Sequence, residues 1–361
     1  MTILSDRGAL VGTLCESLRL EREKRPALEA QDAVKHIFQA LLGVGHLLGR
    51  REAVAARIAA EEEGLAADPA EPLLEAVGPF WCRLNLRRAM VEGLAPDMIA
   101  SLMLQSASNE FFTRRDVHAL CGELVDGISP ADQDAILDEG WLPSHSEAYR
   151  AAYRPAYRVI SADWLPCAEA LCAIARAVRE EPRFLVTLDG PCASGKTTLA
   201  RRLAEVFRAE LVHTDDFYTP HTQKTPERLA IPGGNCDADR LAAELIAPWR
   251  KGEPAVYRRY DCHNDCMVPP EPLSGSPVML LEGSYCNLPV LRAWADVRLF
   301  LDVPEELRMR RLQQRESEAS LRQFAARWIP LENAYFTAYG LPDEGCLVLR
   351  MAEDEMIEKM A

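Results

Sequence analysis

The sequence lacks an excess of basic residues. Its 361 residues include 41 Lys and Arg against 55 Asp and Glu, which gives a formal net charge of −14. Binding nucleic acid over a broad surface requires a basic face that neutralises phosphates. We therefore expect no nucleic-acid partner, although a local basic pocket is compatible with this charge.

Long apolar runs are also missing. No segment approaches the roughly 20 apolar residues that cross a bilayer, and the first residues do not combine a basic lead with an apolar run, as a secretory signal would. We expect no membrane segment. The eleven cysteines follow no framework spacing, which favours reduced thiols and a cytoplasmic location. The sequence leaves homo-oligomerisation open.

Low-complexity segments and internal repeats are absent, and 48% of the residues are hydrophobic, so we expect packed domains, and the length suffices for two. Residues 1–158 are predicted to form a mostly α-helical N-terminal domain. Val34 and Phe38, for example, belong to an apolar face with helical spacing. Asp32 is placed to serve that helix's N-terminus and Gly43 to end it. No run before residue 150 alternates as a strand would.

The pattern changes in residues 159–361, where short apolar runs alternate with helical ones. Strands separated by helices form parallel sheets. We therefore predict an α/β domain of the P-loop kinase type, with a parallel five-stranded sheet flanked by helices. The boundary near residue 158 carries a margin of about ten residues. The predicted strands are Phe184–Leu188, Glu210–His213, Val278–Leu281, Val297–Leu301 and Leu347–Leu349.

A glycine-rich segment after the first of these strands matches G-x-x-x-x-G-K-[ST] in full. Its glycines let the backbone curl so that N–H groups face phosphate oxygens. The lysine supplies positive charge for the outer phosphates, and the threonine hydroxyl can bind Mg²⁺. A helical pattern follows, so the segment lies at a helix N-terminus, which favours anions. The predicted nucleotide-binding residues are Gly190, Pro191, Cys192, Ala193, Ser194, Gly195, Lys196, Thr197 and Thr198.

Cys192 has two interpretations within this segment. A thiol near a helix N-terminus can have a lowered pKa, which would make it reactive. The alternative, which we favour, is a filler side chain in a loop that acts through its backbone.

Carboxylates follow two further strands. Asp215 and Asp216 end one apolar run, and Glu282 ends another. Ligands of an open parallel sheet lie beyond the carboxyl ends of its strands, so we expect these side chains near the glycine-rich segment. Each alone could be a turn, a helix cap or a solvated strand end. Together with the complete loop they indicate a phosphoryl-transfer site.

The segments DGPCASGKTT, TDDFY, YRRYDCH, LLEGSY and LFLDVPEELRMRRLQQRE resemble, in this order, those of the uridine kinase and phosphoribulokinase group of P-loop kinases. The resemblance covers about residues 180–350. It implies that Asp215 is the catalytic aspartate and that Glu282 helps to bind Mg²⁺. It also implies a lid whose arginines close over the triphosphate, and these would be Arg308, Arg311 and Arg315.

The acceptor side departs from the uridine kinase pattern. The spacing before the histidine of YDCH is shorter, and so is the aspartate-rich segment upstream of it. The acceptor is therefore open, either nucleoside-like or another metabolite. The candidate acceptor ligands implied by the resemblance are Asp216, Tyr218, Asp237, Asp239, Tyr260, Asp261 and His263.

A zinc site is an alternative use of part of this region. Cys262, His263 and Cys266 lie together, with Cys236 upstream, and their spacing is within reach of zinc. No second tight Cys/His pair completes four ligands, which disfavours this alternative.

The N-terminal part resembles only uncharacterised bacterial proteins, which adds no activity. Tyr149, Tyr153 and Tyr157 recur every four residues, each followed by arginine, and Pro155 excludes one continuous helix. This Tyr–Arg strip could hold a ligand or partner. The alternative, which we favour, is an amphipathic linker buried between the domains. In the first case we expect the N-terminal domain to help select or cover the acceptor.

Other N-terminal residues allow two interpretations. His46, Arg83, Arg87 and Arg88 could act in catalysis or bind an anion. A lone histidine is more often structural, however, and such arginines more often lie on a solvated face.

The sequence thus predicts a kinase that transfers the γ-phosphoryl group of ATP to a hydroxyl of a small molecule, with Mg²⁺ as cofactor. Lys196 would hold the triphosphate, Thr197 and Glu282 the Mg²⁺, and Asp215 would take the proton of the acceptor hydroxyl. A nucleotide hydrolase and a nucleotide-sensing regulator are the alternatives. The base at Asp215 favours an enzyme, because a sensor needs no such group.

Overall fold

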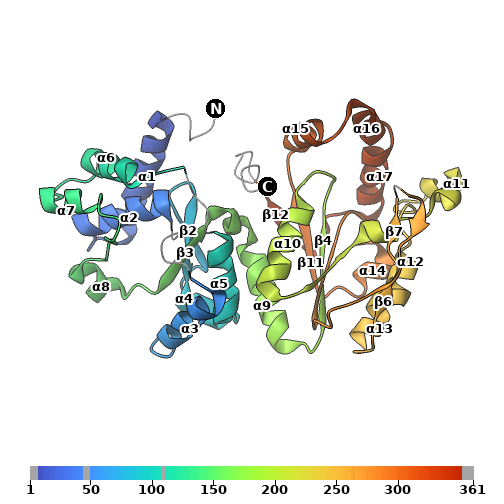
Figure 1. Ribbon diagram of the computed structural model, residues 1–361, viewed down its shortest axis with the longest axis horizontal. Coiled ribbons are helices and arrows are strands. Elements are labelled where there is room, and N and C mark those ends of the chain that lie inside the picture. Colours follow the sequence, from blue (N-terminus) through green and yellow to red (C-terminus); the bar gives the residue numbers. More distant parts are fainter. Residues whose placement is uncertain (1–6, 44–48, 107–110, 263, 352–361) are drawn as a thin grey trace. The chain divides into compact units, whose positions relative to one another are not determined.

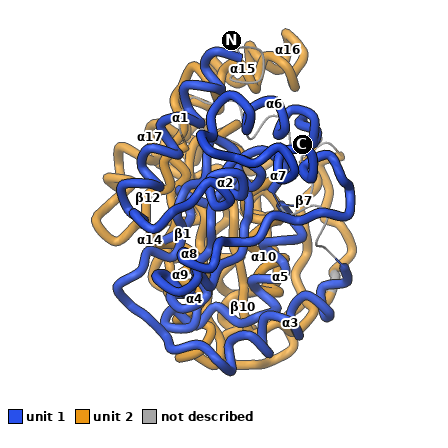
Figure 2. The backbone as a smooth tube through the Cα atoms, turned by 90° about the vertical axis from the view of Figure 1, so that its left-hand side faces the viewer, with its two compact units in different colours: residues 1–168 blue, residues 169–361 orange. Residues whose placement is uncertain are grey.

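The chain divides into two compact units, residues 1–168 and 169–361 (Figure 2). The sequence led us to expect this boundary near residue 158. Among the described residues, no helix is both long and apolar enough to span a bilayer. The computed structural model describes residues 7–43, 49–106, 111–262 and 264–351.

Unit 1 is mostly helical, as predicted, and also contains a three-stranded antiparallel sheet of order β1-β2-β3 (Figure 1). A 3₁₀ helix, Ala162–Cys167, follows the last strand. The elements are α1 Arg7–Lys24, α2 Ala30–Leu42, α3 Arg51–Glu62, β1 Leu74–Val77, β2 Trp81–Asn85, α4 Leu86–Glu92, α5 Pro96–Gln105, α6 Arg114–Leu124, α7 Pro130–Ala135, α8 Glu147–Tyr153 and β3 Tyr157–Ser161.

Two strands, β1 and β2, lie before residue 150, where no run alternates as a half-buried strand would. Trp81 to Leu84 of β2 are all buried, so the strand shows no alternation of apolar and polar residues. Arg83 is among them. Its guanidinium donates to Glu21 at 2.7 Å and to Gln39 at 3.3 Å, which makes burial of the charge tolerable. Arg83 therefore does not lie on a solvated face.

Helix α2 begins and ends close to where its capping residues predict. The carboxylate of Asp32 accepts a hydrogen bond from the Glu29 N–H at 3.1 Å. Gly43 follows the helix with φ +57°, and a Cβ at this position would lie 2.3 Å from the Trp81 ring. Only glycine combines this backbone conformation with so close an approach.

Unit 2 contains the predicted parallel sheet, with strand order β12-β11-β4-β10-β5. All five predicted strands are confirmed. Every residue of β4 and β10 is buried, which fits the mostly apolar sequences of these two strands. The strands are β4 Phe184–Asp189, β5 Glu210–His213, β10 Val278–Glu282, β11 Val297–Asp302 and β12 Cys346–Arg350.

Helices flank this sheet, and α10 packs on β4, β5 and β10. Two short two-stranded sheets, β6–β9 and β7–β8, are separate from the five-stranded sheet. Short 3₁₀ helices span Thr214–Phe217 and His221–Gln223, and π-helical turns span Ala242–Ile246 and Phe324–Trp328. The remaining elements are α9 Ala168–Glu180, α10 Lys196–Phe207, α11 Pro226–Ala230, α12 Ala238–Leu241, α13 Ala247–Arg250, β6 Val256–Tyr257, β7 Tyr260–Asp261, β8 Cys266–Met267, β9 Glu271–Pro272, α14 Pro289–Arg292, α15 Glu305–Arg315, α16 Glu318–Gln323 and α17 Ile329–Tyr339.

The order of the strands decides where the predicted site residues meet. β10 lies between β4 and β5 and runs parallel to both, with Glu282 level with Leu188 on one side and His213 on the other. The segments that follow these three strands therefore leave the sheet at the same edge.

Candidate functional site

The glycine-rich loop, residues 190–195, connects β4 to the N-terminus of α10. Gly190, Ala193 and Gly195 have φ angles of +145°, +58° and +95°. A Cβ at Gly190 would lie 2.6 Å from the carbonyl oxygen of Leu301, so this position requires glycine. The first N–H groups of α10 have no partner within the helix. The loop backbone therefore has the form of a cradle for an anion.

Two side chains at the loop have polar groups that could bind a ligand. The Ser194 side chain is buried, and among the described residues its Oγ has no hydrogen-bond partner. Lys196 is buried as well, and its Nζ donates to the carbonyl oxygen of Pro191 at 2.9 Å. The ammonium thus folds back over the loop onto a neutral acceptor, which a phosphate oxygen could replace.

Glu282 ends β10 beside this loop. Thr197 Oγ1 donates to Glu282 Oε1 at 3.0 Å, and His213 Nδ1 lies 2.5 Å from the same oxygen. The hydrogen bond that His213 donates to the Glu282 carboxylate raises the pKa of His213. His213 was not predicted as a site residue, although its place at the end of β5, just before the two aspartates, was a signal.

The oxygen atoms of Thr197 and Glu282 fit a hard cation such as Mg²⁺, which takes one or two protein ligands and completes its shell with water and phosphate oxygens. A protein-only metal site is a different matter. Among the described residues, no three His, Cys, Asp or Glu side chains are grouped so that they could hold a metal ion. The described residues therefore provide no set of ligands for the zinc site considered above.

Asp215 and Asp216 lie in the turn after β5 but face different groups. Desolvation by the surrounding protein raises the pKa of Asp215, and the negative charge of Glu282 raises it further. Asp215 nevertheless keeps an exposed surface. A Cβ at Gly283 would lie 3.6 Å from Oδ1 of Asp215, which places this carboxylate beside the end of β10. Asp216 instead accepts a hydrogen bond from the Tyr257 hydroxyl at 3.4 Å.

Asp189, which the sequence analysis missed, anchors the start of the loop. It is fully buried and accepts hydrogen bonds from the N–H of Gly190 and from the Tyr335 hydroxyl, both at 2.7 Å. Burial raises the pKa of Asp189 to about 6. Its position directly before Gly190 was an available signal.

Glu332 of α17 holds the middle of the loop and was missed as well. Its carboxylate accepts from the Cys192 N–H at 2.9 Å and from Ser284 Oγ at 2.5 Å. No local pattern could reveal this contact across the sequence. Burial raises the pKa of Cys192 to about 12, which disfavours a reactive thiolate at this position.

The predicted lid helix is α15, and two of its arginines reach the loop. Arg308 donates to the carbonyl oxygen of Cys192 at 3.3 Å, and Arg311 to that of Ser194 at 3.1 Å. Arg315 is exposed and donates to Glu316 at 2.8 Å instead. The structure thus brings Arg308 and Arg311, but not Arg315, to the phosphate-binding loop.

The candidate acceptor residues of the TDDFY and GGNCDADRL segments are not all gathered. Tyr218 lies against Tyr285, with ring centroids 6.4 Å apart. Asp237 caps α12 by accepting from the Arg240 N–H at 3.3 Å, which is a structural role. Asp239 is exposed.

The candidates of the YDCH segment form a hairpin. Tyr260 is buried, and its hydroxyl donates to Asp265 at 2.5 Å. Asp261 accepts from the N–H of Asn264 at 3.1 Å, which closes the turn. His263, like His46 of unit 1, lies outside the described residues.

Lys224 is a further residue that the sequence analysis missed. Its ammonium lies over the rings of Tyr218, Tyr260 and Trp328, at 5.9, 5.9 and 5.8 Å from their centroids. Such a position is favourable for a cation. The lysine follows no motif, so the sequence carried no signal for this arrangement.

The tyrosines of the Tyr–Arg strip pack against unit 1, whereas Arg150 and Arg154 are exposed. Pro155 separates α8 from β3, as predicted. Tyr149 is buried and donates to Glu21 at 3.1 Å, and the Tyr153 hydroxyl accepts from the Ala27 N–H at 2.8 Å. The tyrosines therefore hold α8 and β3 to the body of this unit.

No protein-family model matches the chain, and no curated protein does. Solved structures match it. One is described as a possible uridine kinase from Bacillus stearothermophilus and is 20% identical. That match covers 49% of this chain and 95% of the other, with a TM-score of 0.39. A sugar kinase from a Janibacter species is 24% identical over 49% of this chain and 92% of its own, with a TM-score of 0.28. Both matches lie in the C-terminal half of the chain.

Proposed function

We propose that unit 2 is an ATP- and Mg²⁺-dependent kinase that phosphorylates a hydroxyl of a small molecule. The observation that carries the proposal is the grouping of Lys196, Glu282 and Asp215 where β4, β10 and β5 end, around a loop shaped for an anion. A cation, a metal-binding carboxylate and a base at one point are the parts that phosphoryl transfer needs.

The loop backbone and Lys196 hold the triphosphate in this proposal. The N–H groups at the start of α10 donate to phosphate oxygens, and Lys196 exchanges the Pro191 carbonyl for a charged acceptor. Arg308 and Arg311, which already contact the loop, offset negative charge on the transferred group.

Thr197 Oγ1 and the Glu282 carboxylate would hold Mg²⁺. The ion, when bound, neutralises charge on the outer phosphates. His213 keeps the Glu282 carboxylate in place through its hydrogen bond.

Asp215 orients the acceptor hydroxyl and removes its proton as the phosphoryl group is transferred. Its raised pKa makes it a better base than an ordinary aspartate. Asp216 is directed towards Tyr257 and serves the shape of the acceptor side.

The test is product analysis with γ-labelled ATP, Mg²⁺ and a pool of small metabolites, followed by mass spectrometry. A kinase yields a labelled, phosphorylated acceptor. Release of labelled phosphate alone would point to a nucleotide hydrolase, and binding without turnover to a nucleotide-sensing regulator. Lys251→Ala, at an exposed site in unit 2, is the control for the effect of removing a lysine.

A further inference from the structure

Unit 1 contains a cavity of about 400 Å³ that the proposed kinase chemistry does not use. One wall is apolar and includes Phe38, Ile58 and Met103, from α2, α3 and α5. A cavity of this size lies in the range of small-molecule sites, which are mostly apolar with a few placed polar groups.

The other wall is polar and comes from α2, β3 and the segment before α8. Lys35, Gln39, His145 and Tyr157 line it. Lys35 is half-buried, and its Nζ donates to the carbonyl oxygen of Pro143 at 3.0 Å. Within the described ranges this lysine forms no ion pair, and burial lowers its pKa to about 8. An ammonium so placed lacks the anion that would best satisfy it.

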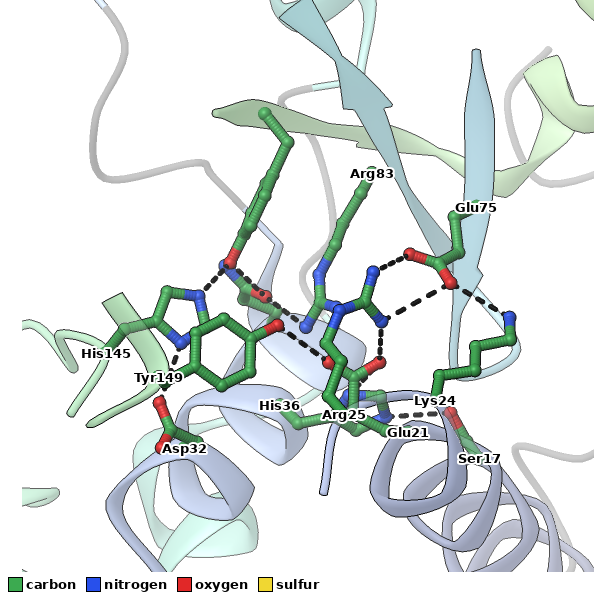
Figure 3. Close-up of polar contacts among 12 residues, drawn as sticks. Ser17, Glu21, Lys24, Arg25, Asp32, His36, Glu75, Arg83, His145 and Tyr149 are labelled. Atoms are coloured by element: carbon green, nitrogen blue, oxygen red, sulfur yellow. Dashed lines mark hydrogen bonds and ion pairs between the residues drawn. The ribbon is translucent and has the colours of Figure 1, made fainter. Parts of the chain in front are cut away.

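A chain of buried hydrogen bonds fixes the remaining polar groups (Figure 3). His145 Nδ1 lies 2.8 Å from Asp32 Oδ1, and its Nε2 lies 2.6 Å from the Tyr157 hydroxyl. Because the Asp32 carboxylate can only accept, His145 donates through Nδ1 and accepts the hydrogen bond of the Tyr157 hydroxyl at Nε2. Gln39 Nε2 completes the set by donating to the Tyr157 oxygen at 3.2 Å.

The acids near this wall are already engaged. Asp32 accepts from His145 and from the Ser146 N–H at 3.0 Å. Glu21 pairs with both Arg83 and Arg25 at 2.7 Å. These carboxylates are therefore bound by other donors, and within the described residues none of them forms an ion pair with Lys35.

The residues at the rim of the cavity also carry a net positive charge. Of the described residues that line it, Lys35, Arg57 and Arg158 are basic and only Glu61 is acidic. Glu61 pairs with Arg158. An anion would therefore be attracted, while a cation would meet Lys35.

We propose that this cavity of unit 1 binds a small organic carboxylate, with its charge at Lys35 and its apolar body against Phe38, Ile58 and Met103. A single ammonium among neutral hydrogen-bonding groups suits one carboxylate. A phosphate dianion would need more donors than the polar wall provides. The site is independent of the kinase proposal, since every residue in it belongs to unit 1.

Calorimetric titration of the full chain tests this proposal with hexanoate, benzoate and phenylacetate, each beside its uncharged amide, and with inorganic phosphate. At least one acid should bind at least about tenfold more tightly than its amide, because the amide cannot pair with Lys35. Phosphate should bind more weakly than that acid.

Lys35→Met keeps the aliphatic stem, removes the charge and should abolish the preference for acid over amide. Lys251→Met is the control and should leave it unchanged. Thermal unfolding reports whether each variant is folded. The proposal would be overturned if no acid binds, if each acid binds no better than its amide, if phosphate binds most tightly, or if Lys35→Met keeps the preference. The comparison of acid with amide on the unchanged chain decides the matter even if Lys35→Met fails to fold.

Discussion

At the scale of single residues, the two adjacent aspartates show how one turn assigns different roles. Asp215 lies beside the end of β10 and interacts with Glu282 and Lys196, whereas Asp216 contacts Tyr257. The motif alone predicts Asp215 by its register in TDDFY. The structure adds the environment that would make it a base.

We therefore predict that Asp215→Asn lowers kcat by about 10²- to 10⁴-fold while nucleotide affinity is retained, because only proton removal is lost. Asp216→Asn is the matched control and should have a much smaller effect on kcat. Steady-state kinetics and nucleotide titration measure the two quantities. A crippled Asp216→Asn beside an active Asp215→Asn would show that the register is wrong.

A second residue-scale prediction concerns pH and His145. Burial lowers the pKa of His145 to about 4, below its ordinary value near 6.5. The unfolded chain therefore takes up a proton first as the pH falls, so the free energy of unfolding of unit 1 decreases between about pH 6.5 and 4.

Hydrogen exchange of the α2 amides at pH 7 and 5, corrected for intrinsic rates, measures this loss. Burial lowers the pKa of His36 to about 3, so this histidine contributes to the same slope. His145→Gln removes one titrating group and should flatten the dependence. An unchanged slope in His145→Gln would contradict the assignment of this histidine as neutral and buried.

At the scale of elements, helix α17 fixes the phosphate-binding loop from a distance in sequence. Glu332 holds the Cys192 N–H, and the Tyr335 hydroxyl donates to Asp189 at 2.7 Å and accepts from the Asn287 N–H at 3.1 Å. These contacts connect the helix to the segments that follow β4 and β10.

Tyr335→Phe removes one fully buried hydroxyl and leaves the Asp189 carboxylate short of a donor. We predict that unit 2 loses about 1.5–3 kcal/mol of unfolding free energy, the usual value of a hydrogen bond to a charged group. Tyr339→Phe on the same helix is the control, because the hydroxyl of this partly buried tyrosine donates to a neutral acceptor, the Pro232 carbonyl, at 3.3 Å. Urea unfolding followed by hydrogen exchange compares them, and equal losses would refute this role of Tyr335.

The elements that the sequence predicted are those with a local signal. The five strands of unit 2 are short apolar runs between helices, and the glycine-rich loop is a contiguous motif. β2 was not predicted, because a salt bridge to Glu21 allows the charged Arg83 to lie within its buried residues. Glu332 and Lys224 were not predicted as site residues, because their contacts join segments far apart in the sequence. The spacing of residues in a motif does not reveal such contacts. Arg315 was predicted to close over the triphosphate but donates to Glu316 instead. Helical spacing predicts which face of a helix a residue lies on, but not which group a long side chain contacts.

At the scale of the whole molecule, the division into units suggests how to separate their tasks. Ser161 ends β3, which pairs with β2 inside unit 1. A cut near Ser161 would therefore leave part of this unit on the fragment. A fragment of residues 169–361 contains the complete five-stranded sheet and every residue proposed for phosphoryl transfer.

We predict that this fragment folds and binds ATP–Mg²⁺ with the affinity of the full chain, which circular dichroism and nucleotide titration can check. Once the acceptor is known, kcat/KM of the fragment and of the full chain can be compared. A lower value for the fragment would support a role of unit 1 in selecting the acceptor. Equal values would exclude such a role and leave the cavity around Lys35 with a separate task.

Turnover by Lys196→Ala tests the central claim, that unit 2 transfers a phosphoryl group at its glycine-rich loop, most directly. The measurement is the rate of labelled-product formation from γ-labelled ATP by Lys196→Ala, by Lys251→Ala and by the unchanged chain, with folding verified by circular dichroism. We predict a loss of about 10²-fold or more for Lys196→Ala, because the charge that faces the outer phosphates is gone, and no change for Lys251→Ala. Undiminished turnover by a folded Lys196→Ala protein would contradict the account.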